Sequence, residues 1–207
     1  MSTSTLSEPL VTASTPTEAT HPESSFFANQ YLILNELTDT LAQVSEAQAS
    51  AAIHAILTAP RIFVTGAGRS GLALKMAAMR LMHLGLTVHV VGEITTPAIA
   101  PRDLLIAASG SGTTAGVVLA AVTAADAGAN VLAITTAPRS PLAAVASVVL
   151  LLPAATKQDT SATRSQQYAG ALFEQSVLLL TDALFQSMWQ QRGETAAQLW
   201  KRHANLE

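Results

Sequence analysis

Between residues 61 and 152, five short apolar runs alternate with segments of helical spacing, and this alternation limits the chain to very few folds. Strands that alternate with helices form a parallel sheet with right-handed crossovers, covered by helices on both faces. The predicted fold class is therefore α/β, a three-layer α-β-α sandwich around a five-stranded parallel sheet. Buried strands are predicted at 61–65, 87–91, 103–108, 130–135 and 147–152, with helices at 70–84, 114–127 and 141–146.

Helical spacing continues on both sides of this region. Residues 27–57 are predicted to form one or two helices, with a break near 46–50, and Pro60 ends them. A long helix is predicted at 168–191 and a last one at 194–205. With 207 residues, 49% of them hydrophobic, the chain is large enough for a single well-packed core, and we assign 27–207 to one flavodoxin-like domain.

The amino-terminal region differs in composition from the rest. Twelve of the first 25 residues are Ser or Thr, with little apolar sequence to bury, so we predict a disordered Ser/Thr-rich tail at 1–26. This region resembles neither a secretory signal nor a mitochondrial presequence, and we expect a cytoplasmic protein. No stretch is apolar enough to span a membrane, so no membrane partner is expected.

Charge and cysteine content exclude several classes of function. The net charge is −3, and residues 1–60 contain six acidic residues and no Lys or Arg, which leaves 11 basic against 8 acidic residues in the remainder. That small positive surplus suits a small anionic ligand but does not provide a track for nucleic acid. The chain contains no Cys, which excludes disulfides and thiolate metal sites.

The segment Ser109-Gly-Ser-Gly-Thr-Thr114, here called the hydroxyl loop, lies between a predicted strand and a predicted helix. Glycines let the backbone approach a ligand closely, and the first N–H groups of a helix, together with its dipole, favour an anion. In the alternative interpretation, Ser and Thr only cap the helix. Four hydroxyl groups exceed what one cap needs, so we predict a phosphate site made by Ser109, Gly110, Ser111, Thr113 and Thr114.

A second segment, Gly66-Ala-Gly-Arg-Ser-Gly71, is called the glycine loop and follows the first predicted strand. Its residue pattern matches the dinucleotide-binding fingerprint G-x-G-x-x-G. Such a site also needs an acidic residue near the end of the second strand, and Glu93 lies only approximately at that position. Two glycine-containing loops at the carboxyl ends of neighbouring strands instead define one crevice. We predict that it holds a compact phosphorylated ligand.

Both loops, together with Gly92-Glu-Ile-Thr-Thr-Pro97, resemble the SIS (sugar isomerase) domain. Further segments resemble the 6-phospho-3-hexuloisomerase family, and this resemblance covers about 27–207. They are Met79–Gly85, Val91–Ile99, Thr156-Lys157, Gly170–Glu174 and the ending Arg202–Glu207.

The resemblance implies interconversion of D-arabino-3-hexulose 6-phosphate and fructose 6-phosphate through a cis-enediol(ate), the second step of formaldehyde fixation in the ribulose monophosphate pathway. It implies no cofactor and no metal, a homo-oligomer that is a tetramer with sites near subunit contacts, and functional coupling to 3-hexulose-6-phosphate synthase. Two alternatives stay open: an aldose–ketose isomerase of the arabinose 5-phosphate type, and a non-catalytic sugar phosphate sensor. The lack of basic residues in the first 60 positions argues against DNA contact by such a sensor.

Glu174 is the candidate base. It shares a helix face with Val177, Leu178 and Thr181, and a carboxylate on a mostly apolar stripe has the environment that acid–base catalysts near neutral pH need. Alternatively, Glu174 pairs with a basic residue, or it reaches solvent at the start of the helix, where its negative charge interacts favourably with the helix dipole. The resemblance places a functional Glu in this Gly-x-Leu-Phe-Glu motif.

The resemblance also implies roles for other polar residues. His83 and His203 are candidate proton-transfer partners, His203 from a neighbouring subunit, although a lone His in a helix is often only structural. The resemblance implies that Gly68, Arg69 and Ser70 line the sugar phosphate site, where the Arg69 cation could stabilise an enediolate, and that Thr95 and Thr96 hold substrate hydroxyls. In the alternative, Ser70 is a helix cap, Arg69 a loop charge and the threonines part of a strand-end turn. Lys157 is a weaker candidate for the site and is expected to be a loop charge.

Two positions depart from the family pattern. Many relatives carry Glu or Gln where this chain has Thr113, and Ser or Thr where it has Ala171. The first change puts sugar contacts by residue 113 in doubt, and the second could alter the orientation of Glu174. Neither removes the candidate base.

Overall fold

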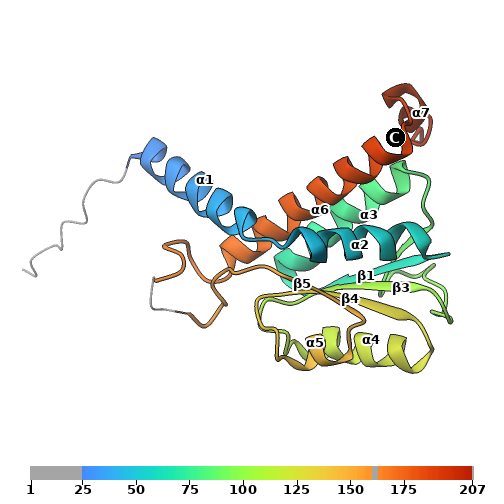
Figure 1. Ribbon diagram of the computed structural model, residues 1–207, viewed down its shortest axis with the longest axis horizontal. Helices are drawn as coiled ribbons and strands as arrows, with labels where there is room; N and C mark the ends of the chain where they lie inside the picture. Colours follow the sequence, from blue (N-terminus) through green and yellow to red (C-terminus); the bar gives the residue numbers. More distant parts are fainter. Residues whose placement is uncertain (1–24, 160–162, 207) are drawn as a thin grey trace, which may run out of the picture.

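The computed structural model describes residues 25–159 and 163–206, and it is a three-layer α-β-α sandwich (Figure 1). Its five strands are all parallel and lie in the order β2-β1-β3-β4-β5. The predicted α/β class is therefore confirmed. The strands are β1 (Ile62–Gly66), β2 (Val88–Val90), β3 (Leu104–Ala108), β4 (Asn130–Thr135) and β5 (Val148–Leu151).

Helices cover both faces of the sheet, as expected for strands that are apolar throughout. On one face pack α2 (Glu46–Thr58), α3 (Gly68–His83) and α6 (Ala171–Arg192), and α1 (Phe26–Ala42) packs against α6 and extends beyond the sheet. On the other face pack α4 (Ala115–Asp126) and the short α5 (Pro141–Val145). The last helix, α7 (Ala196–Trp200), lies at the end of α6.

The predicted break between the first two helices, at 46–50, lies three to five residues too late, because the structure places it at 43–45. The polar run at 46–50 is already helical, because Ser45 caps α2 by accepting a hydrogen bond from Gln48 N. Glu46 then lies in the first turn, where its charge suits the helix dipole.

The ends of two other helices also differ from the prediction. The long helix begins at Ala171, because Ala169 takes a left-handed φ of 52° and Gly170 is the N-cap. The last helix is shorter than predicted and begins after Thr195, which forms a capping box with Gln198. The predicted tail lies almost entirely outside the described residues.

The order of the strands creates a switch point between β1 and β3. From β1 the chain moves outward to β2, and it then returns to the other side of β1 to form β3. Ligands of open α/β sheets bind at such a point, beyond the carboxyl ends of the strands. The glycine loop follows β1 and the hydroxyl loop follows β3, so both predicted loops lie there.

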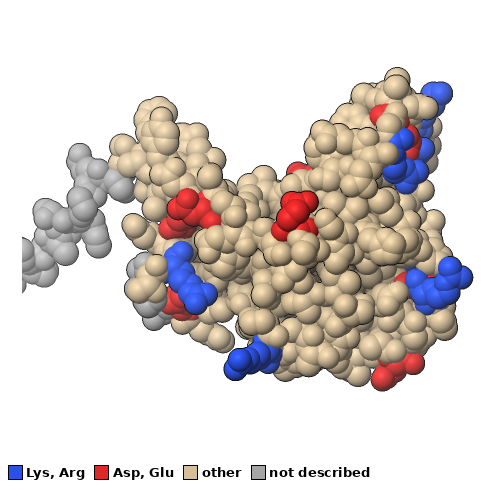
Figure 2. All heavy atoms as spheres, viewed as in Figure 1, with Lys and Arg blue, Asp and Glu red and all other residues tan. Residues whose placement is uncertain are grey.

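Charged side chains are few and scattered on the face shown in Figure 2, with no continuous basic track. Among the helices that the structure describes, none is both long and apolar enough to cross a membrane.

Candidate active site

A cavity of about 240 Å³ opens at the switch point, lined by both loops and by the connection between β5 and α6. This volume is near the lower end of the range for small-molecule sites, about 300 Å³, and suits a compact ligand. We call it the hydroxyl cavity, because six of its lining residues carry a hydroxyl group. These are Ser70, Ser109, Ser111, Thr113, Thr114 and Thr156.

The hydroxyls of the hydroxyl loop bond in pairs. Ser109 Oγ lies 2.9 Å from Thr114 Oγ1, and Ser111 Oγ lies 2.8 Å from Thr113 Oγ1. Thr114 is the N-cap of α4, yet its side chain makes no capping hydrogen bond to the helix within the described structure. The interpretation that these residues only cap the helix therefore does not explain the loop.

The backbone of the hydroxyl loop is held from β4 and α5. Gly110 O accepts hydrogen bonds from Thr135 Oγ1 at 3.0 Å and from Thr136 Oγ1 at 2.9 Å. Gly112 has a φ of +64°, and a Cβ there would lie 2.0 Å from Ser140 Oγ. The loop therefore has one tightly fitted conformation, which pre-organises its donors toward the cavity.

The helix that follows the glycine loop also starts at the cavity. Its N-cap, Ala67, provides no side-chain cap, and Gly68 begins the helix with a φ of +57°. Ser70 is buried and lines the cavity, and it is not the N-cap of α3, which is Ala67. Two helix N-termini, those of α3 and α4, thus meet at one cavity, which favours an anion.

Glu174 lies beside this cavity, in the first turn of α6. Its side chain is only 8% exposed, and each oxygen faces a cation: Arg69 Nε lies 2.8 Å from Oε2, and Lys157 Nζ lies 3.7 Å from Oε1. The carboxylate of Glu174 is therefore buried, as predicted, but two cations also contact its oxygens. The alternative, in which Glu174 pairs with a basic residue, describes the structure better.

Lys157, only a weaker candidate by sequence, belongs to this site. It lines the hydroxyl cavity and contacts Glu174, whereas a loop charge was expected. Its position in the sequence could have indicated this, because Lys157 follows β5 and the carboxyl ends of parallel strands share one edge of the sheet.

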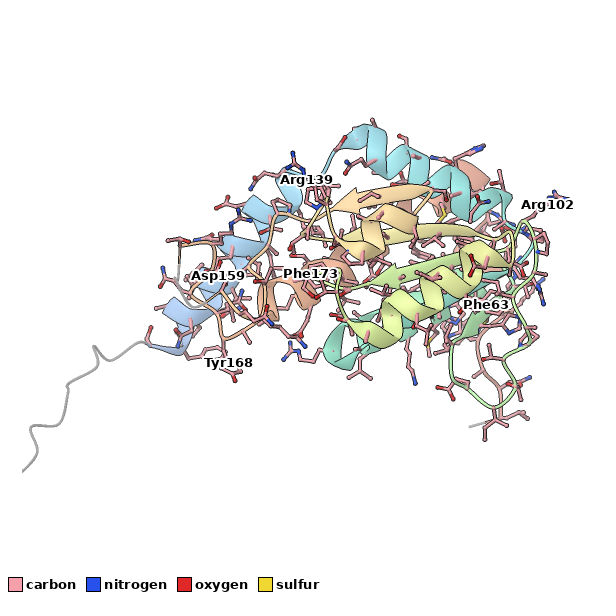
Figure 3. The ribbon with its side chains drawn as sticks, turned by 90° about the horizontal axis from the view of Figure 1, so that it is seen from below. Phe63, Arg102, Arg139, Asp159, Tyr168 and Phe173 are labelled. Atoms are coloured by element: carbon pink, nitrogen blue, oxygen red, sulfur yellow. The ribbon has the colours of Figure 1, made fainter. Side chains whose placement is uncertain are left out.

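Phe173 was not predicted as a site residue. It lines the cavity and packs against Gly110, and Figure 3 shows it beside the sheet, with Tyr168 farther out on the connection.

His83 and His203 come together, but not at this cavity. Their rings stack with centroids 3.9 Å apart at the end of α3. His83 lies fourteen positions after Arg69, which corresponds to about 21 Å along a helix. Within one chain, the structure therefore does not bring these histidines to Glu174.

The His83 imidazole is buried, and its Nδ1 has no hydrogen-bond partner among the described atoms. Burial lowers the pKa of His83, and the positive charges that His203 and Arg80 can carry lower it further. Arg202 fastens the C-terminal segment over this end of α3, because its Nη1 donates to His83 O at 2.9 Å.

The two threonines predicted to hold substrate hydroxyls also lie apart from the hydroxyl cavity. Thr96 Oγ1 donates to Val90 O at 2.5 Å, as in a strand-end turn, and Thr95 is exposed. Neither is among the residues that line the cavity.

The two departures from the family pattern do lie near the cavity: Thr113 lines it, and Ala171 is the first residue of α6. Among the described residues, no group of three or more His, Cys, Asp or Glu could hold a metal ion.

Comparison with known proteins gives consistent matches over most of the chain. The SIS domain family matches residues 55–179. A 3-hexulose-6-phosphate isomerase of Mycobacterium gastri is 55% identical over 86% of this chain and 90% of its own. A 3-hexulose-6-phosphate isomerase of Bacillus subtilis is 40% identical over 84% of this chain and 95% of its own.

A solved structure adds the same match in three dimensions. A protein of Methanococcus jannaschii, whose crystal structure infers a molecular function of 3-hexulose-6-phosphate isomerase, superposes with a TM-score of 0.75. It is 29% identical and is matched over 86% of this chain and 99% of its own.

Proposed function

The chain belongs to the SIS domain family and, within it, to the 3-hexulose-6-phosphate isomerases, and from this premise we propose that it interconverts D-arabino-3-hexulose 6-phosphate and fructose 6-phosphate. This is the isomerisation step of formaldehyde fixation through ribulose monophosphate. We expect the enzyme to work in the cytoplasm, on the product of a 3-hexulose-6-phosphate synthase.

The observation that carries this proposal is a buried carboxylate next to a hydroxyl-lined anion cavity. The hydroxyl loop and the two helix N-termini provide donors for the 6-phosphate. Glu174 lies beside that cavity, one residue after Phe173, which lines it. A sugar phosphate that is anchored by its phosphate then extends its reacting carbons toward Glu174.

The reaction needs one base and a stabilised oxygen. Glu174 takes the proton from C2, the C–H electron pair forms the C2–C3 double bond, and the C3 carbonyl electrons move onto O3. A proton then passes from O2 to O3, the C2 carbonyl forms, and Glu174 returns its proton to C3. The atoms and electrons balance without an external oxidant or reductant.

We further propose that His83 and His203 act in the site of a second subunit. On α3, Arg69 and His83 share a face with the exposed side chains of Leu72, Met76 and Met79. Met76 lies midway between Arg69 and His83 in the sequence. If two copies packed α3 against α3 in antiparallel fashion about Met76, the His83 of each copy would lie beside the Arg69 and Glu174 of the other.

Such a dimer would cover an apolar face that is otherwise open to water. The side chains of Leu72, Met76 and Met79 are each more than half exposed in the single chain. Apolar surface of this kind favours association. Pairs of these dimers would make the expected tetramer, in which each site draws residues from two chains.

The function is tested by supplying ribulose 5-phosphate, formaldehyde and a 3-hexulose-6-phosphate synthase, and by measuring fructose 6-phosphate. We expect turnover with the wild-type chain and a loss of about 100-fold or more in kcat for Glu174→Gln. Asp182→Asn is the matched control, because Asp182 lies on the same helix but is half exposed and faces Arg80. Phosphosugar binding without any turnover would contradict the proposal and indicate a sensor.

A further inference from the structure

Lys157 occupies the boundary between the hydroxyl cavity and Glu174. It lines the cavity together with the hydroxyl loop, while its Nζ lies 3.7 Å from Glu174 Oε1. Glu174 itself also borders a separate surface hollow, together with Arg69, Leu72 and Met76. The Lys157 ammonium group therefore lies between the hydroxyl cavity and the Glu174 carboxylate.

The stem of Lys157 is confined, although its charged end is not. A Cβ at Gly170 would lie 2.9 Å from Lys157 Cγ, so only glycine leaves room for the stem at that position. The Nζ lies 3.9 Å from the place that a Cβ of Gly68 would take, at the start of α3. The side chain is nonetheless 63% exposed, so the ammonium group can move while its base stays in place.

The two cations differ in their distance from the Glu174 oxygens and in the side from which they approach, although both side chains are exposed to the same extent. Arg69 contacts Oε2 at 2.8 Å from the surface hollow, whereas Lys157 faces Oε1 at the longer distance of 3.7 Å from the cavity. A substrate C–H must approach a carboxylate oxygen from the cavity side, where Lys157 now lies. Proton abstraction therefore requires Lys157 to leave Glu174, and Arg69 can stay.

We propose that Lys157 is a catalytic residue that moves from Glu174 to O3 of the substrate as the enediolate forms. The inference rests on the proposed isomerase function and goes beyond it by assigning the cation that receives the new negative charge. As Glu174 accepts the C2 proton, negative charge leaves the carboxylate and appears on O3. A cation that follows this charge stabilises the transition state more than the ground state.

The position of Lys157 favours O3 over the phosphate as its partner. O3 is bonded to a carbon adjacent to C2, and C2–H must meet Glu174, so O3 arrives within a few ångströms of the carboxylate. The phosphate has its own donors in the hydroxyl loop, which lies on another part of the cavity wall. Lys157 forms no covalent bond with the substrate, and it returns to Glu174 when the C2 carbonyl is complete.

The test compares wild type with Lys157→Met, which keeps the stem and removes the charge, and with Lys157→Arg, which keeps a cation. Arg164→Gln is the matched control, since it removes an exposed positive charge from the same connection. We expect Lys157→Met to lower kcat by about 100-fold while KM changes by less than about threefold. We expect Lys157→Arg to recover part of kcat and Arg164→Gln to leave both constants near wild type.

A binding experiment distinguishes the enediolate from the phosphate as the partner of Lys157. The first probe is 4-phosphoerythronohydroxamate, whose adjacent oxygens mimic O2 and O3 of the enediolate, and the second is glucitol 6-phosphate, which has the phosphate but no planar enediolate. Lys157→Met should weaken the hydroxamate by about the factor lost in kcat and leave glucitol 6-phosphate nearly unchanged. Equal weakening of both probes, or weakening of neither, would overturn the assignment.

This binding experiment does not require turnover. If the wild-type chain made no fructose 6-phosphate, the proposed function would fail by the coupled assay. The hydroxamate comparison would still show whether Lys157 recognises an enediolate. A kcat of Lys157→Met within about twofold of wild type would overturn the catalytic role even if the isomerase activity were established.

Discussion

His83 and His203 stack face to face at the end of α3, with 3.9 Å between ring centroids and an interplanar angle of 19°. One ring comes from the helix that starts at the glycine loop, and the other comes from the last residues of the chain. Protonating both rings at once would place two positive charges in contact, close to Arg80. Protonation of His83 is therefore disfavoured in the folded chain.

We predict that stability falls as the pH drops below about 6.5, and that His83 is one cause. The pKa of His83 is lowered from 6.5 in the folded chain, so around that pH the unfolded state binds more protons than the folded state. The contribution of His83 to the free energy of unfolding is thus fully present above pH 6.5, and it decreases as the pH falls toward the pKa of His83 in the folded chain. Thermal unfolding between pH 8 and 5 measures this, and His83→Gln should show a flatter dependence.

The control for this measurement is His54→Gln, because His54 is exposed on α2. It should keep the wild-type dependence on pH. Equal slopes for wild type and His83→Gln would contradict the prediction.

Glu36 is predicted to fasten the connection between β5 and α6 to α1. Its carboxylate accepts hydrogen bonds from Ser165 Oγ at 2.7 Å, Gln166 N at 2.7 Å and Gln167 Nε2 at 3.0 Å. Burial raises the pKa of Glu36, but these hydrogen bonds outweigh it and hold the pKa below 4.5. This contribution to stability is present above pH 4.5 and is lost as the pH falls through the folded pKa.

At neutral pH, Glu36→Ala should therefore loosen residues 165–167 and speed their amide hydrogen exchange by about tenfold, as expected for the loss of more than 1 kcal/mol. Asp39→Asn, an exposed change on the same helix, should leave that exchange unaltered. If the exchange of 165–167 were the same in Glu36→Ala as in wild type, the carboxylate would not be what holds this segment.

Gly112→Ala is predicted to damage both stability and phosphate binding. A Cβ at this position would lie 2.0 Å from Ser140 Oγ, and the φ of +64° disfavours any residue with a side chain. We expect a loss of about 2 kcal/mol or more in the free energy of unfolding, measured in urea, with weaker binding of glucitol 6-phosphate. Gly116→Ala is the control, because a Cβ at Gly116 meets nothing within 4 Å, and it should be neutral or slightly stabilising.

The sequence predicted the sheet and the hydroxyl loop well because both depend on local patterns. Apolar runs of β-branched and aliphatic residues identify buried strands, and every predicted strand is present. The hydroxyl loop follows from its position between a strand and a helix. Such features need no knowledge of distant contacts.

The electrostatic surroundings of Glu174 could not be predicted in this way. Arg69 and Lys157 lie more than 100 and nearly 20 residues away from it in the sequence, and only the packing of α3 and the β5–α6 connection places them on its two oxygens. The helical spacing of Val177 and Thr181 gave only the apolar side of the environment. The stacking of His83 on His203 is equally non-local, since it depends on Arg202 holding the chain end against α3.

The proposed dimer can be tested with a single cysteine, because the wild-type chain contains none. If two α3 helices pack in antiparallel fashion about Met76, each Met76 faces its copy, and Met76→Cys should form an intermolecular disulfide under mild oxidation. Helices in contact lie about 8 to 10 Å apart between axes, and side chains directed at the shared axis approach closely enough for the bond. We expect a covalent dimer on a non-reducing gel.

Leu119→Cys is the matched control, because Leu119 is 67% exposed but lies on α4, on the opposite face of the sheet. It should stay monomeric on the same gel. A Met76→Cys chain that cross-links no faster than Leu119→Cys would contradict the α3 packing. Mixing Glu174→Gln chains with His83→Gln chains then tests the shared site, since a mixed dimer keeps one intact site and should recover part of the activity that each variant alone has lost.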